Sequence, residues 1–193
     1  MLRLDRRFRE AGFVTVNWGY SSWFQPIDRH AERLSARIGE LDADSDVRAI
    51  HFATHSMGCV VTRAALQKYM PSKAGRWVMY GPPNKGSFIA NKVPRFVKSV
   101  LRPIDEMQAK PDSYVNSLDI PQAMDIAIVE ATFDYIVASS LTHITEENDR
   151  LVVPGLHSQM LFREDVAQES IHFLEHGRFA HESTEASTAT TES

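Results

Sequence analysis

The sequence of 193 residues predicts an α/β fold, in which helices cover both faces of a mostly parallel sheet. Short apolar runs alternate along the chain with longer segments whose apolar residues recur at helical spacing. The composition is 43% apolar and 24% charged, as in soluble globular proteins, and no apolar run reaches the ~20 residues of a membrane-spanning helix. We therefore expect one soluble domain over residues 1–181 and a disordered polar tail at 182–193.

The most informative stretch is Val47–Leu66, which has the pattern of a strand, a sharp turn and a helix. Val47–Ala53 is a short apolar run typical of a buried parallel strand, and Cys59–Met70 has apolar residues at helical spacing without proline or glycine. Between them, Thr54–Gly58 matches the nucleophile-elbow motif G-x-S-x-G except that threonine replaces the first glycine. The residues flanking this strained turn must be small, and threonine is at the upper limit.

Ser56 occupies the nucleophile position of this motif. A serine hydroxyl needs a base within hydrogen-bond reach and donors for the oxyanion, and the backbone N–H of Met57 at the helix start is a candidate oxyanion donor. The alternative interpretation is an ordinary strand-to-helix turn that happens to contain a serine.

The remaining elements follow in alternation. Helices are expected at 1–11, 27–41 and 165–173, and strands at 13–18, 76–80, 125–129 and 151–153. A glycine-rich loop at 81–87 leads into a basic amphipathic excursion at 88–120. We interpret 88–120 as a cap or lid over the site. The alternatives are a plain surface helix or an element that contacts an anionic membrane surface transiently.

Charge and cysteine content limit the other function classes. Basic residues predominate in residues 1–100 and acidic residues in 101–193, but no nucleic-acid motif accompanies them, so we expect no nucleic-acid partner. The single cysteine, Cys59, excludes an internal disulfide, and we expect it to be a small buried residue. The N-terminus has no signal-peptide pattern, which favours the cytoplasm for the chain as it stands and leaves the compartment unknown if a segment precedes it. The sequence does not indicate an oligomeric state.

Elbow-based hydrolases present their catalytic residues in the order serine, acid, histidine, and Ser56, Asp134 and His157 follow that order. Asp134 lies just beyond a predicted strand, where an acid can orient a histidine. Alternative acids and histidines remain: Asp125, Glu130, Asp149, His51, His55, His143, His172 and His176.

Several segments resemble the lipase-like serine hydrolases of the α/β-hydrolase superfamily, the group that includes small bacterial lipases and inositol deacylases. The similar segments are THSMG, WVMYGPPNKGSFIA, LVVPGLHSQM and IHFLEHGRF. The departures are Thr54 and Cys59 in place of glycines and an altered setting around Asp134. The resemblance implies a carboxylic ester hydrolase with a Ser56–Asp134–His157 triad, acting on a small-molecule or lipid ester through an acyl-enzyme. The alternatives are a silent binding module on the same fold and an acyltransferase.

We expect neither a cofactor nor a metal. His172–His176 matches the zinc pattern H-x-x-E-H, but only a polar tail follows it to supply a further ligand.

In the resembled fold, the second oxyanion donor comes from a loop that precedes the first helix. We therefore expect this chain to be an N-terminally shortened version of a longer protein. The missing strand would lie between the strand at 13–18 and the elbow strand.

Overall fold

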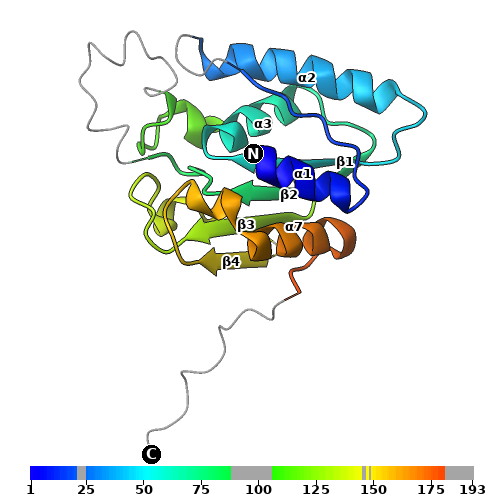
Figure 1. Cartoon of the computed structure of the whole chain (residues 1–193). Coiled ribbons are helices and arrows are strands. Elements are labelled where there is room, and N and C mark those ends of the chain that lie inside the picture. Colours follow the sequence, from blue (N-terminus) through cyan, green and yellow to red (C-terminus); the bar gives the residue numbers. More distant parts are fainter. Residues whose placement is uncertain (21–24, 88–105, 145–146, 148, 181–193) are drawn as a thin grey trace, which may run out of the picture.

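The structure is a computed structural model that describes residues 1–20, 25–87, 106–144, 147 and 149–180. Its sheet has four parallel strands in the order β1-β2-β3-β4, which is also their order along the chain (Figure 1). The strands are β1 (Ile50–His55), β2 (Ala74–Tyr80), β3 (Ile126–Ala131) and β4 (Asp149–Val153).

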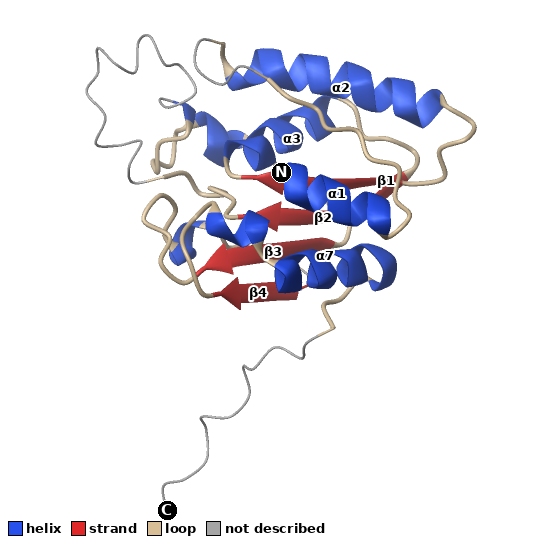
Figure 2. Ribbon diagram, viewed as in Figure 1, coloured by secondary structure: helices blue, strands red, loops and turns tan. Residues whose placement is uncertain are grey.

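Helices cover both faces of this sheet, as predicted (Figure 2). Helices α2 (Ile27–Ala43) and α3 (Met57–Lys68) cover one face, and α1 (Leu2–Glu10) and α7 (Glu164–His176) cover the other. Short 3₁₀ turns lie at η1 (Tyr114–Ser117), η2 (Ser139–Leu141) and η3 (Gln159–Phe162).

The runs Trp77–Tyr80 in β2 and Ile126–Val129 in β3 are apolar at every position because both faces of these strands are buried there. In β2, Trp77 and Met79 pack toward α2 and α3, whereas Val78 and Tyr80 pack toward α1 and α7. The Tyr80 hydroxyl also donates a hydrogen bond of 2.7 Å to Ser170 in α7. The strand therefore connects the two halves of the core.

The predicted strand at 13–18 is wrong. This segment is an irregular, extended coil in which Val14 is 97% exposed and Val16 is 47% exposed. It is held against α1, because Thr15 donates a hydrogen bond to Asp5 and Arg9 donates one to the Thr15 carbonyl. A strand needs a neighbour for its backbone groups, and within the described residues β1 is the edge of the sheet on this side. There is accordingly no gap inside the sheet.

The other predicted elements are present with shifted ends. Strand β1 begins three residues later than expected and continues through Thr54 and His55, up to the turn itself. Residues 88–105, where most of the predicted cap and its membrane contact would lie, and the predicted tail at 182–193 are outside the described residues. The domain limits therefore stay a prediction. No helix in the described segments is long and apolar enough to cross a membrane.

All four strands run in the same direction, so their carboxyl ends meet at one edge of the sheet. Ser56 follows β1, Gly81 follows β2, Asp134 lies three residues beyond β3 and His157 lies four residues beyond β4. The topology therefore brings the loops that carry the predicted triad to the same edge.

Candidate active site

Ser56 is the turn residue between β1 and α3. Its backbone has φ 54° and ψ −126°, and it is the only non-glycine residue with positive φ in the described part of the chain. Its N–H donates to the Tyr80 carbonyl at 2.9 Å, and its own carbonyl accepts from the Cys59 N–H at 2.9 Å in the first turn of α3. Such a conformation costs on the order of 1–3 kcal/mol and persists only where neighbouring contacts enforce it. This is the backbone geometry of a nucleophile elbow.

Thr54, which replaces the first glycine of the elbow motif, fits without displacing the helix. A methyl group added at Gly58 would lie 3.9 Å from the Thr54 Cβ, which is ordinary van der Waals contact. The Thr54 hydroxyl accepts a hydrogen bond of 2.7 Å from the indole N–H of the fully buried Trp77. Threonine therefore supplies a hydrogen-bond acceptor that glycine would lack.

Cys59, the second departure from the motif, is fully buried as expected. Its thiol donates to the Thr54 carbonyl at 3.3 Å, and the Thr54 hydroxyl lies 3.2 Å from its sulfur. Burial raises the pKa of the Cys59 thiol to about 12, so the thiol stays protonated at neutral pH. A protonated, buried thiol is a packing residue rather than a nucleophile.

His157 and Asp134 contact each other directly. The His157 Nδ1 lies 2.5 Å from the Asp134 Oδ2, and both side chains are less than 10% exposed. The other carboxylate oxygen, Oδ1, accepts the backbone N–H groups of Ile136 and Val137 at 2.9 and 2.8 Å. Burial raises the pKa of Asp134, but the hydrogen bonds from His157 and these backbone groups outweigh it, so the pKa lies below its usual range.

This pairing leaves the other imidazole nitrogen available. An ionised carboxylate can only accept hydrogen bonds, so Nδ1 carries a proton, and the lone pair of the neutral form of the ring then lies on Nε2. The His157 Nε2 is buried and has no hydrogen-bond partner among the described residues. A buried lone pair without a partner can take a proton from a nearby hydroxyl.

The His157 ring lies against the ends of β1 and β2. Its centroid is 4.7 Å from that of His55, the residue immediately before Ser56. A methyl group added at Gly81, whose φ is 52°, would lie 2.8 Å from the His157 Cε1 and 3.4 Å from the Asp134 Oδ2. Only glycine leaves room for the imidazole and the carboxylate at this position.

Known proteins resemble this chain in structure rather than in sequence. No protein-family model and no curated protein matches the sequence. The metagenomic carboxyl esterase MGS0156 matches with a TM-score of 0.62 at 16% identity, over 81% of this chain and 58% of the esterase. The Bacillus licheniformis lipase BlEst2 matches with a TM-score of 0.55 at 11% identity, over 68% of this chain and 67% of the lipase. Phospholipase PlaB from Legionella pneumophila matches with a TM-score of 0.52 at 17% identity, over 67% of this chain and 33% of the phospholipase.

The chain has an α/β-hydrolase fold. This confirms the fold class predicted from the sequence, and the similarity extends to structures whose sequences are at most 17% identical over the matched region. The chain spans one third of the PlaB chain and 58% of the MGS0156 chain.

On this α/β-hydrolase fold, the alternative acids do not contact His157. The Asp125 carboxylate pairs with Arg76 at 3.2 Å. The Asp149 carboxylate accepts the backbone N–H of Phe179 at 2.6 Å. Glu130, the third alternative, takes part in the ion-pair cluster described below.

The alternative histidines have other partners. The His51 ring accepts a hydrogen bond of 3.0 Å from the Arg76 N–H, and His143 contacts Arg150 and Glu147. In α7 and just after it, His172 contacts the Arg178 carbonyl, and His176 lies 3.7 Å from Glu175. Although the rings of His172 and His176 are 4.4 Å apart, the described residues contain no group of three or more side chains that could hold a metal ion.

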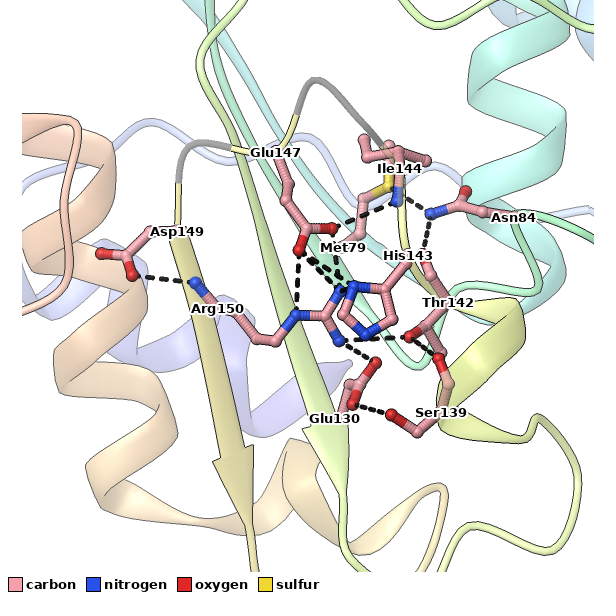
Figure 3. A network of polar contacts seen from close by, with 10 residues as sticks. All are labelled: Met79, Asn84, Glu130, Ser139, Thr142, His143, Ile144, Glu147, Asp149 and Arg150. Atoms are coloured by element: carbon pink, nitrogen blue, oxygen red, sulfur yellow. Dashed lines mark hydrogen bonds and ion pairs between the residues drawn. The ribbon is translucent and has the colours of Figure 1, made fainter. Parts of the chain in front are cut away.

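Arg150 in β4 is the centre of a polar cluster that joins β3, β4 and the connection between them (Figure 3). Its guanidinium pairs with Glu130 in β3 and with Glu147, at 2.7 Å for the latter. The other Glu130 oxygen accepts the Ser139 hydroxyl at 2.8 Å. The Glu130 side chain is 5% exposed and the Arg150 side chain is 16% exposed, so this ion pair is largely shielded from solvent.

The far end of the same loop is attached to the residues that follow β2. Asn84 donates a hydrogen bond of 2.6 Å to the Thr142 carbonyl, and the Lys85 N–H donates one of 2.9 Å to the Leu141 carbonyl. The Ser87 hydroxyl donates to the Ile136 carbonyl at 2.7 Å. The loop around Asp134 is therefore held from both β3–β4 and β2.

Sequence reasoning did not identify these supporting contacts. Glu130 was considered only as an alternative acid, although a glutamate in an otherwise apolar strand is a sign that a buried cation pairs with it. Its partner, Arg150, is twenty residues away, so the pairing follows from strand register and not from spacing. His55 precedes Ser56 and so does not fit the chain order serine, acid, histidine, yet it contacts His157.

We predict that Thr54→Val lowers the free energy of unfolding by about 1–3 kcal/mol, because it keeps the side-chain shape but leaves the buried Trp77 N–H without an acceptor. Thr54→Ser, which keeps the hydroxyl, is the matched control. Urea unfolding followed by tryptophan fluorescence measures both. Equal stability of the valine variant and wild type would contradict the assigned hydrogen bond.

We also predict that Arg150→Met destabilises the fold by about 3–5 kcal/mol, since it leaves the Glu130 carboxylate buried without its counter-charge. Adding Glu130→Gln to this variant should recover part of the loss. Arg37→Met removes an exposed pair with Glu40 and should cost at most about 1 kcal/mol. If Arg150→Met were no more destabilising than Arg37→Met in chemical unfolding, the cluster would not be a structural anchor.

Proposed function

We propose that this chain is a serine hydrolase that cleaves carboxylic esters through Ser56, His157 and Asp134. The observation that carries the proposal is the environment of His157. Its Nδ1 is held by a carboxylate, its Nε2 is buried without a hydrogen-bond partner among the described residues, and its ring lies against His55, the last residue of β1, which precedes Ser56. The fold supports the proposal, because solved structures that resemble it include a lipase and a carboxyl esterase.

In the first half of the reaction, the His157 Nε2 removes the proton from the Ser56 hydroxyl as its oxygen attacks the ester carbonyl carbon. The resulting imidazolium is stabilised by the Asp134 carboxylate. The Met57 N–H, at the N-terminal end of α3, is aligned with the helix dipole and stabilises the oxyanion. The tetrahedral intermediate collapses when His157 returns the proton to the leaving alcohol.

In the second half, water attacks the acyl group on Ser56 while the His157 Nε2 accepts a proton from the water. Collapse of this second intermediate breaks the acyl–serine bond, returns the proton to the Ser56 oxygen and releases the carboxylic acid. Every proton moves between substrate, water, Ser56 and His157. If an alcohol accepted the acyl group in place of water, the same steps would give acyl transfer.

The side chains around the proposed triad favour an ester with an apolar part. Phe133 and Tyr135, on either side of Asp134, are 58% and 77% exposed, and Ile136 and Leu156 are both 44% exposed. Large apolar side chains gathered on the loops of a site are typical of ligand-binding surfaces. The proposed substrate is therefore a small-molecule or lipid ester with a hydrocarbon portion.

Alanine replacement of Ser56 tests the proposal. We expect Ser56→Ala to abolish hydrolysis of a p-nitrophenyl ester. Its free energy of unfolding should stay within about 1 kcal/mol of the wild-type value, because the hydroxyl does not pack in the hydrophobic core. His157→Ala should lose nearly as much rate, since triad members act as a unit, and Asp134→Asn should lose less. Asp149→Asn is the matched control for the acid. Wild-type rates in Ser56→Ala would refute the proposal, and a rate loss in Asp149→Asn but not in Asp134→Asn would refute the choice of acid.

A further inference from the structure

We propose that His55 is a positioning residue that connects the nucleophile turn to the loop of the catalytic base, an inference that rests on the function proposed above. His55 is the last residue of β1 and immediately precedes Ser56. Its imidazole contacts both the backbone and the ring of His157. It would act through His157 and would not itself touch the substrate.

The first contact is a hydrogen bond to the main chain. The His55 Nε2 lies 3.3 Å from the His157 carbonyl oxygen. A carbonyl oxygen can only accept, so the His55 Nε2 must carry a proton and donate it. This contact spans 102 residues of sequence and joins the end of β1 to the loop after β4.

The second contact is between the two rings. Their centroids are 4.7 Å apart and their planes are inclined by 45°. Because the His157 Nδ1 is held by Asp134 on one side, the His55 ring limits how far the imidazole can tilt away from that bond. The two contacts together hold His157 by its carbonyl and by its ring face.

Burial keeps His55 neutral. Burial, together with the neighbouring His157 and the chain's amino terminus, lowers the pKa of His55 to about 4, although the hydrogen bond to the His157 carbonyl and the Asp134 carboxylate oppose this shift. Near neutral pH, His55 is therefore a donor without a positive charge. It can restrain His157 without the repulsion that a second cation would exert on the imidazolium formed during the reaction.

The position of His55 gives it an effect on rate in particular. Asp134 orients the His157 ring relative to the loop after β3, but the proton transfer occurs between His157 and Ser56. His55 adjoins Ser56 in the chain, so its contacts relate the base directly to the nucleophile. Proton transfer depends on the position of the His157 imidazole relative to the Ser56 hydroxyl, and a displacement of about 1 Å can cost on the order of 10²-fold in rate. The binding of the ester depends much less on the relative position of these two side chains.

Two replacements separate the donor from the ring. His55→Phe keeps an aromatic ring against His157 but removes the donor, and His55→Gln keeps an N–H donor on a side chain of similar length. We expect His55→Phe to lower kcat for a p-nitrophenyl ester by roughly 10- to 100-fold with KM changed less than about twofold, and His55→Gln to restore most of that loss. His176→Phe, on the exposed end of α7, is the control for replacing a histidine by phenylalanine.

A spectroscopic measurement distinguishes positioning from general damage. In His55→Phe, the downfield proton resonance of the His157 Nδ1–H bound to Asp134 should persist, because that hydrogen bond does not involve His55. Persistence of this resonance with a lowered kcat supports the proposal. Its disappearance would assign His55 a structural role and overturn the proposal. If His55→Phe does not fold, His55→Leu, which also lacks a donor and is smaller, takes its place in the same comparison.

The kinetic outcomes also separate this proposal from the proposed function. If wild type is active and Ser56→Ala is not, while His55→Phe has the wild-type kcat, only the role of His55 is refuted. Equal loss in His55→Gln and His55→Phe would likewise refute the donor role. If Ser56→Ala retains the wild-type rate, the proposed function fails, whatever the His55 variants do.

Discussion

The hydrogen bond from the Ser56 N–H to the Tyr80 carbonyl fixes the point at which β1 stops and α3 begins. It extends the parallel register of β1 and β2 by one more residue and holds Ser56 at a positive φ that serine seldom adopts. Tyr80 is itself held by packing on the α1–α7 face and by its hydroxyl bond to Ser170. The strain at Ser56 is therefore offset by contacts with the fully buried end of β2, and the proposed nucleophile lies on a rigid support.

Two groups of charged side chains with different consequences lie along β3, β4 and the connection between these strands. Arg150 balances one of the two negative charges of Glu130 and Glu147, and these ion pairs fasten β3, β4 and the loop between them together. Asp134, by contrast, faces only a histidine and two backbone N–H groups, and its negative charge is available to an imidazolium. Because Glu130 is engaged by Arg150, β3 can carry Glu130 near its end and lead into Asp134 without the two acids competing for His157.

The sequence predicts best where one local cause dominates. The runs WVMY in β2 and IAIV in β3 are apolar at every position because both faces are buried, and the turn at Ser56 has a motif of its own. Prediction failed at 13–18, where alternating valines suggest a strand but only a partner strand could have satisfied its backbone. It also missed the contacts of Thr54 with Trp77 and of Glu130 with Arg150, because these depend on which residues the sheet register brings together.

The central claim is that Ser56 is a nucleophile activated by its surroundings, and covalent labelling tests it most directly. The protein is incubated with a fluorophosphonate, the mass of the intact chain is measured, and the modified residue is located by peptide mass spectrometry. The account predicts a single phosphonyl adduct on Ser56, formed at a rate that falls sharply in His157→Ala because the base is gone. An unlabelled chain, under conditions where a known serine hydrolase reacts, or an adduct on another residue would contradict it.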